Sequence, residues 1–115
     1  MMTPTDIMDG MQAKNRLLTA KNDEYVVLSE RFAEAKRNYH MSYAKKTLEL
    51  KDEGNPITII KEIVNGDKHV SELRYTMDVA DGIMKACKES MADTRAALDS
   101  YRSLLTWLRA ELQSQ

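Results

Sequence analysis

The chain has 115 residues, of which 30% are charged and only 6% aromatic, and its formal net charge is −1 at pH 7. This composition is typical of one domain built from long helices, and it excludes the bulk positive field of a protein that holds nucleic acid or an anionic membrane by overall charge. The single cysteine, Cys87, excludes an intramolecular disulfide framework. The sequence shows neither a signal peptide nor an apolar stretch as long as a membrane span, so we expect a cytoplasmic protein without a membrane partner.

A first long helix is predicted over 4–52 of a single domain, 1–115. Thr3 is a suitable N-cap and Pro4 suits the first helical position. Gly54 is a suitable residue just past the helix end, and Pro56 follows two positions later.

A short second helix is predicted over 58–65, with Thr58 as its N-cap and Gly66 as its stop. We expect this segment to reverse the chain and to cap the end of a two-helix core. The residues expected to close that end are Ile57, Ile60, Ile63 and Val64.

A third helix is predicted over 68–113, capped by Asp67. Its apolar residues alternate at spacings of four and three, which is the pattern of a coiled-coil seam with one polar member, Thr94. The seam consists of Leu73, Met77, Ala80, Met84, Cys87, Met91, Thr94, Leu98, Tyr101, Leu105, Leu108 and Leu112, and Ile83, Ala97 and Leu104 are expected to widen it.

The first helix carries a weaker seam. Met11, Leu18, Tyr25, Phe32 and Tyr39 recur every seven residues, and Ile7, Leu28 and Ala35 fill part of the companion row. Lys14 and Lys21 interrupt that row, so we expect the N-terminal third of the helix to splay, fray or meet another subunit.

These patterns predict an all-α fold, an antiparallel coiled-coil-like hairpin of two long helices with a short capping helix at the turn. Folding the chain back at its middle would place Tyr25, Phe32 and Tyr39 near Leu98, Met91 and Met84. Because two helices cannot surround a core, we expect two hairpins to pair into a four-helix bundle. The third helix has a second face of small or apolar residues for this contact: Val79, Gly82, Ala86, Ala96, Ser100, Ser103, Trp107 and Ala110, with Leu104 beside it.

The inventory of catalytic side chains is poor. The chain has two histidines, His40 and His69, and it lacks zinc-ligand spacing and a glycine-rich phosphate loop. Cys87 lies on the seam, where we expect a buried structural thiol. We therefore predict that the protein is not an enzyme and has no catalytic residue, cofactor or metal.

Two basic surfaces are candidates for partner binding. Residues 36 to 46 combine basic groups with rings that could stack on single-stranded nucleic acid: Lys36, Arg37, Tyr39, His40, Tyr43, Lys45 and Lys46. The competing interpretation is that the tyrosines face the core and the lysines face water. On the third helix, Arg74, Lys88, Arg95, Arg102 and Arg109 line one flank of the seam, where charge pairs with the first helix or a second subunit are expected, with phosphate binding as the alternative.

The turn carries a recognisable pattern, made by Gly54, Pro56, Ile57, Thr58 and Ile60, and the helix that follows opens with Gly66, Asp67, Val70, Leu73 and Arg74. With these motifs, residues 40 to 105 resemble small all-helical proteins of phages and prophages of Gram-positive bacteria. Members of this group are mostly uncharacterised and tend to be encoded near genes for recombination and single-strand DNA handling. The resemblance implies an accessory role in the host cytoplasm and identifies no functional residue.

The sequence therefore predicts a non-enzymatic, oligomeric interaction module that binds itself and a protein partner, with an accessory part in DNA recombination or replication. Two alternatives stay open. The protein could bind single-stranded DNA directly through residues 36 to 46, or it could sequester a host protein as an inhibitor.

Overall fold

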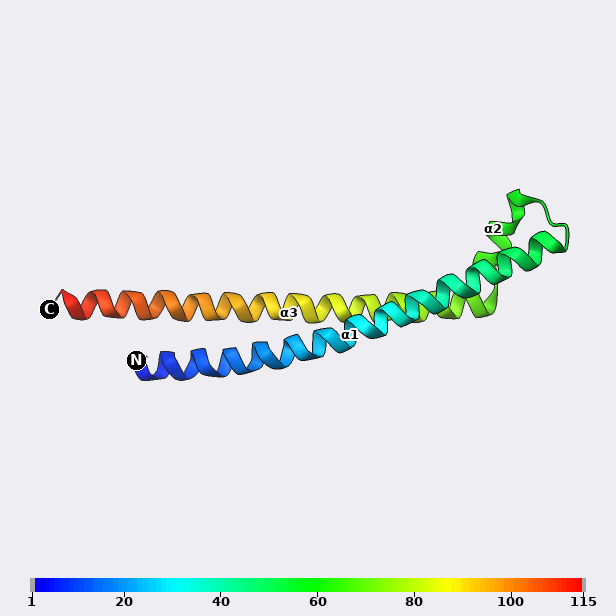
Figure 1. Cartoon of the computed structure of the whole chain (residues 1–115). Helices are drawn as coiled ribbons and strands as arrows, with labels where there is room; N and C mark the ends of the chain where they lie inside the picture. Colours follow the sequence, from blue (N-terminus) through cyan, green and yellow to red (C-terminus); the bar gives the residue numbers. More distant parts are fainter. Residues whose placement is uncertain (1, 115) are drawn as a thin grey trace. The chain divides into compact units, whose positions relative to one another are not determined.

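The fold is all-α, and in the computed structural model, which describes residues 2–114, every regular element is a helix (Figure 1). Helix α1 covers Pro4–Asp52, α2 covers Ile57–Gly66 and α3 covers Lys68–Gln113. The bounds expected for α1 and α3 are confirmed, and α2 is one residue longer at each end than expected.

The start of α1 is fixed by a reciprocal cap. The Asp6 backbone N–H donates to the Thr3 hydroxyl at 3.2 Å, and the Thr3 backbone N–H donates to the Asp6 carboxylate at 2.9 Å. Hydrogen bonds from Thr3, first from its backbone N–H and then from its side chain, lower the pKa of the Asp6 carboxyl. The stabilisation linked to this shift is present above the ordinary carboxyl pKa and is lost as the pH falls through the lowered one.

The end of α1 is fixed by Gly54, whose φ is +85°. The Gly54 N–H donates to the Lys51 carbonyl at 3.0 Å and the Asn55 N–H donates to the Leu50 carbonyl at 3.1 Å. The Asn55 side-chain amide donates to the same Leu50 oxygen at 3.0 Å. This pair of backbone bonds is the Schellman motif, which ends a helix by placing one residue in the left-handed region.

Helix α2 starts differently from the sequence prediction. Pro56 occupies the N-cap position with extended backbone and makes no side-chain capping bond, so the assignment of Thr58 as N-cap is wrong. Proline fixes the φ angle in a range that leads into a helix, and no hydroxyl is needed to define the start. At the other end, Asp67 caps α3 as expected, because its carboxylate accepts the Val70 N–H at 3.0 Å.

The chain forms two compact units, Met1–Val26 with Ala86–Gln115 and Val27–Lys85. We call them the terminal unit and the turn unit. Helices α1 and α3 contribute to both units, and within each unit their segments run antiparallel (Figure 1).

The core of the turn unit lies where α2 packs on the last turns of α1. Leu50, Ile60, Val64 and Val70 form one buried cluster, and Tyr39 and Tyr43 pack against it. The prediction for the four apolar residues of this segment is half right. Ile60 and Val64 are 4% and 0% exposed, whereas Ile57 and Ile63 are 78% and 38% exposed, because a ten-residue helix can turn only one stripe toward its neighbour.

The core of the terminal unit is formed by residues of the predicted seam. Ile7 is fully buried at the start of α1, and Cys87, Met91 and Leu98 are buried on α3. The expected fraying of the N-terminal third is not seen, because α1 is helical from Pro4. The expected splaying is not seen either, because Ile7 is buried and Gly10 lies against the Tyr101 ring, whereas contact with another subunit stays a prediction.

Polar groups within this seam are satisfied. The half-buried Lys21 ammonium donates to the Ser90 hydroxyl. The buried Thr94 hydroxyl donates to the Ser90 carbonyl at 2.9 Å, and the Cys87 thiol donates to the Lys21 carbonyl at 3.6 Å. A lysine interrupts the seam without breaking it, because its alkyl stem can lie on apolar surface while its ammonium finds a partner.

The register of the two long helices differs from the expected one. Tyr25 was expected near Leu98, but Lys21, one turn earlier, bonds to Ser90 and Cys87. A Cβ on Gly10 would likewise lie 2.6 Å from the Tyr101 ring. The shift is roughly three helical turns. The shift in register follows from the position of α2, which lies beside the last turns of α1. Helix α3 therefore starts level with Lys46, whose ammonium lies 3.8 Å from the Asp67 carboxylate, and not level with the end of α1.

The same shift explains the exposed end of α3. With Tyr101 opposite Gly10, the residues of α3 beyond Trp107 have no residue of α1 opposite them, because α1 begins at Pro4. Leu112 is accordingly 63% exposed although it belongs to the predicted seam.

We predict that Gly54→Ala lowers the free energy of unfolding by about 1 kcal/mol, because a Cβ is disfavoured in the left-handed region. Gly66→Ala is the control, since Gly66 has no positive φ and open space around it. The control should raise the free energy of unfolding by roughly 0.5 kcal/mol through helix propensity. Urea unfolding followed by circular dichroism measures both, and equal losses in the two variants would contradict the cap.

Candidate interaction surfaces

One side of the turn unit carries an apolar groove between α1 and α3. Its volume is about 320 Å³. Val79 and Ile83 on its α3 wall are 42% and 50% exposed, and Val27, one turn before Arg31, is 46% exposed. The groove is lined by Leu28, Arg31, Ala35, Thr76, Val79, Ala80 and Ile83.

The terminal unit exposes apolar residues at the equivalent places beside the seam. Leu104 lies three heptads after Ile83 and is 42% exposed, and Trp107 lies four heptads after Val79 and is 57% exposed. Leu17 on α1 is 41% exposed. We call these exposed residues the apolar side of each unit: Val27, Val79 and Ile83 in the turn unit, and Leu17, Leu104 and Trp107 in the terminal unit.

Residues of the apolar side were only partly anticipated. Ile83 and Leu104 were expected to widen the core, but both are exposed, because one partner helix covers only the central stripe of α3. Ala97 is half-buried. The predicted second face is exposed at every position, and its members beyond the apolar side are small: Gly82, Ala86, Ala96, Ser100, Ser103 and Ala110.

The basic stretch of residues 36 to 46 divides between core and solvent. Tyr39 and Tyr43 are half-buried against the turn cluster, with ring centroids 6.0 Å apart. The His40 ring lies 5.3 Å from that of Tyr39, and it is exposed together with Lys36, Arg37 and Lys45. Most of the apolar area of the two tyrosines is therefore buried by packing within the chain. Nucleic-acid binding by this stretch stays a prediction.

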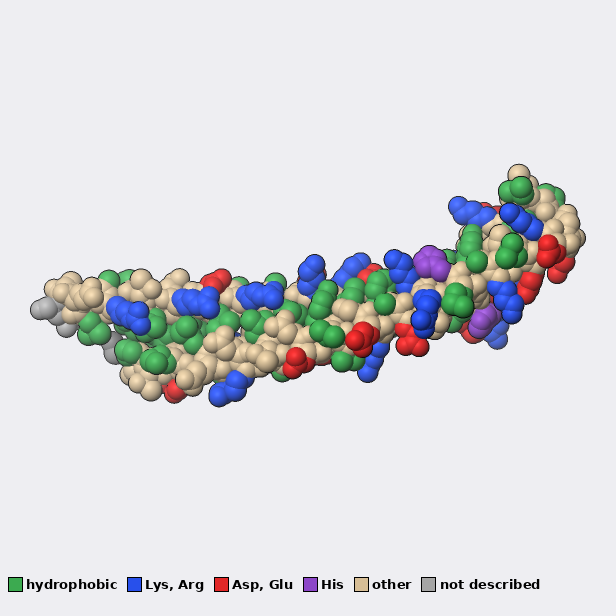
Figure 2. Space-filling model, viewed as in Figure 1, with side chains coloured by type: hydrophobic (Ala, Val, Ile, Leu, Met, Phe, Trp, Pro, Cys, Tyr) green, Lys and Arg blue, Asp and Glu red, His purple; other side chains and the backbone are tan. Residues whose placement is uncertain are grey.

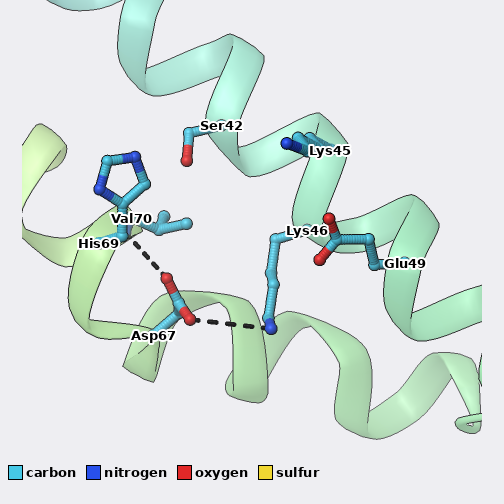
Figure 3. Close-up of a pocket in the computed structure, with 7 residues that line it drawn as sticks. All are labelled: Ser42, Lys45, Lys46, Glu49, Asp67, His69 and Val70. Carbon is cyan, nitrogen blue, oxygen red and sulfur yellow. Dashed lines mark hydrogen bonds and ion pairs between the residues drawn. The ribbon is translucent and has the colours of Figure 1, made fainter.

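A polar pocket of about 210 Å³ lies where α1 meets the start of α3 (Figure 3). One Asp67 carboxylate oxygen faces the Lys46 ammonium at 3.8 Å, and the other accepts the Val70 N–H (Figure 3). Lys45, Glu49 and His69 line the rest with Ser42. This pocket could not be predicted from the sequence, because Lys46 of α1 meets Asp67 only when α2 lies beside the end of α1. Mixed charge in the pocket leaves it without a net attraction for an anion.

The basic flank of α3 lies on the other side of the seam from the apolar side. In the terminal unit it borders a cleft of about 300 Å³, lined by Asn15, Leu18, Arg95, Leu98, Asp99 and Arg102. Lys and Arg side chains recur along α3 in Figure 2. The expected charge pairs with α1 are not formed within residues 2–114, where Arg102 pairs with Asp99 of its own helix at 3.0 Å.

Groups with intrinsic reactivity are few and separated. Among residues 2–114, no three His, Cys, Asp or Glu side chains come together as a metal ion would require. Cys87 is buried, which confirms its predicted place on the seam. Asp81 raises the pKa of the Lys85 ammonium, first by a hydrogen bond of 2.8 Å and then by its charge, which is an ordinary surface pair along one helix.

No protein-family model, curated protein or solved structure matches the chain. The resemblance of residues 40 to 105 to phage and prophage proteins therefore stays a prediction. Across the described part of the chain, none of the helices combines the length and the apolar character needed to cross a membrane.

We predict that Asp67→Ala lowers the free energy of unfolding by about 1 kcal/mol, because α3 loses its N-cap. Asp67→Asn should cost less than about 0.5 kcal/mol, since asparagine caps equally well and only the partly exposed pair with Lys46 is lost. Denaturant unfolding separates the two variants. Equal losses would assign the role of Asp67 to the ion pair and not to the cap.

Proposed function

We propose that the protein is a non-enzymatic helical interaction module that works as a homo-oligomer, in which two hairpins pair through their apolar sides into a four-helix bundle. The observation that carries this proposal is the amount of surface that one chain leaves uncovered.

The accessible surface of the chain is 8366 Å² for a mass of 13.2 kDa. A folded monomer of this mass exposes about 6,400 Å² by the usual scaling of surface with size. The excess is about 1,900 Å² per chain, which exceeds the roughly 800 Å² that each partner hides in a standard interface. Two chains that each hid this excess would bury about 3,800 Å² in total, which falls in the range of permanent homodimers.

The core is correspondingly thin. Only Ile7, Val64 and Val70 have fully buried large side chains among the described residues. Several seam residues, such as Leu18, Phe32 and Leu105, are half-buried. A second hairpin would cover these residues from the side, which is how helices of a four-helix bundle share a core.

The apolar side is the surface that fits such a contact. Its exposed side chains lie beside the seam on both helices, and the small residues Gly82 and Ala86 next to Val79 and Ile83 allow a close approach of another helix. Burial of this surface would convert two thin seams into one continuous core.

A phage or prophage accessory role, in DNA recombination or replication, is the part that we propose for this interaction module. The support for this role is the resemblance at the turn alone. Direct binding of single-stranded DNA by residues 36 to 46 and sequestration of a host protein are the alternative proposals. Salt-sensitive binding of an oligonucleotide that is lost on changing Lys36, Arg37 and Lys45 to Ala would favour the first of these.

We predict that Ile83→Glu converts the oligomer to a monomer at micromolar concentration, because a carboxylate would be buried in the contact without a partner. Ile57→Glu is the matched control, since Ile57 is 78% exposed on α2 and lies outside the apolar side. Light scattering after size-exclusion chromatography gives the mass of each variant. A wild-type chain that is monomeric across a wide concentration range would refute the proposal.

A further inference from the structure

The basic flank of α3 repeats with the period of a coiled coil. Four cationic residues follow one another at intervals of seven: Lys88, Arg95, Arg102 and Arg109. Asp81 lies between Arg74 and Lys88 and interrupts the row there. All four are exposed. Seven residues of helix rise about 10.5 Å, so the four cationic groups form an evenly spaced ladder along one edge of the terminal unit.

This ladder has no counterpart on α1. The two α1 residues that line the cleft with Arg95 and Arg102 are Asn15 and Leu18, and Met8 and Asn22 lie one heptad before and after Asn15. None of these residues is acidic. Within residues 2–114, Lys88, Arg95 and Arg109 make no ion pair, and the pair of Arg102 with Asp99 is exposed on both sides.

A second copy of the chain does not offer a matching ladder either. Of all its Asp and Glu residues, only Asp23 and Glu30 are seven positions apart, and Arg16 and Arg37 continue that row in the two directions. The apolar side, where the proposed second hairpin docks, lies across the seam from the basic flank. A homo-oligomer formed there would leave the ladder free.

The chemistry of the ladder favours a helix over a nucleic acid. Charges that repeat every seven residues meet their complements when another helix packs alongside in coiled-coil register, which is how flanking charges select partners. Three of the four groups are guanidinium forks, which hold carboxylates in bidentate geometry. The Leu18 and Leu98 side chains between Asn15 and Arg95 give the cleft an apolar floor for the residues of such a helix. No aromatic ring, on which a base would stack, lines the cleft.

We propose that the cleft beside Lys88, Arg95, Arg102 and Arg109 is the docking site for an acidic amphipathic helix of another protein, with carboxylates at seven-residue spacing. This surface is distinct from the apolar side, so the chain would join its own copy on one side of the seam and an acidic partner on the other.

The test uses the full chain and a fluorescent synthetic peptide of four heptads, with Leu at the seam positions and Glu at the flanking positions. A second peptide carries Gln in place of every flanking Glu. The triple variant Arg95→Gln, Arg102→Gln, Arg109→Gln removes the ladder, and glutamine keeps helix propensity. The charge-matched control is Arg16→Gln, Arg37→Gln, Lys51→Gln, whose positions are exposed on α1.

Anisotropy titrations should show saturable binding of the acidic peptide that weakens about tenfold in the ladder variant, as expected for three charge pairs, and stays within about twofold in the control. The affinity for the acidic peptide should also fall as the salt concentration rises from about 50 mM to 300 mM. The affinity of the wild-type chain for the Gln peptide should not exceed the affinity of the ladder variant for the acidic peptide. Absence of binding to the acidic peptide, or equal loss in both triple variants, would overturn the proposal.

A single-stranded thymidine oligonucleotide is titrated in parallel. Tighter binding of the oligonucleotide than of the peptide, with the same dependence on the ladder, would assign the flank to phosphate and would also overturn the proposal. Light scattering on the same samples keeps the two proposals apart, because the ladder variant should retain the mass of the wild-type oligomer whether or not it binds the peptide.

Discussion

Two helices can bury only the stripe that each turns toward the other, and most features of this molecule depend on that constraint. Along α3, the residues at the centre of the stripe are buried or half-buried as far as Leu108, whereas Ile83 and Leu104, which lie one step to the side, remain half exposed. Widening a seam requires a third and a fourth helix. The surplus surface of the chain is therefore a direct consequence of its topology.

Two polar residues of the seam, Lys21 and Thr94, have hydrogen-bond partners within it. The Ser90 hydroxyl accepts a hydrogen bond from Lys21 of α1, and the Ser90 carbonyl accepts one from Thr94, which lies one turn later on α3. No buried side-chain nitrogen or oxygen in the described residues lacks a hydrogen-bond partner. Apolar contact gives little orientation along a uniform stripe, whereas the hydrogen bonds from Lys21 to Ser90 and from Cys87 to Lys21 join α1 to α3 in this register alone. The polar interruption that weakens the seam in the sequence thus favours the same alignment that the packing of α2 on α1 sets.

Helix ends and the seam of α3 could be read from the sequence because both depend on local chemistry. Thr3, Gly54 and Asp67 act on backbone groups within a few residues of themselves. The register could not be read, because it depends on whether α2 extends the hairpin or lies beside it. That choice is made by Ile60 and Val64 packing on Leu50, a contact between segments that sequence periodicity does not relate.

The candidate surfaces divide in the same way. The exposure of Val79, Gly82 and Trp107 follows from their distance from the seam and was predictable, and so was the burial of Tyr39 and Tyr43 as one of two interpretations. The lack of charge pairs between the basic flank and α1 was not predictable. It depends on the register, which places Asn15 and no acidic residue in the cleft with Arg95 and Arg102.

The basic row of α3 and the exposed residues Val79, Ile83, Leu104 and Trp107 lie on opposite flanks of the α3 seam, and this separation has a physical consequence. A hairpin whose two flanks were both apolar would associate without defined stoichiometry, since each flank could accept a further copy. A row of cations on one flank opposes a second hairpin there, because like charges would be brought together, while the other flank stays free to bury apolar surface. In the proposed homo-oligomer, the basic flank would therefore limit self-association to the apolar side.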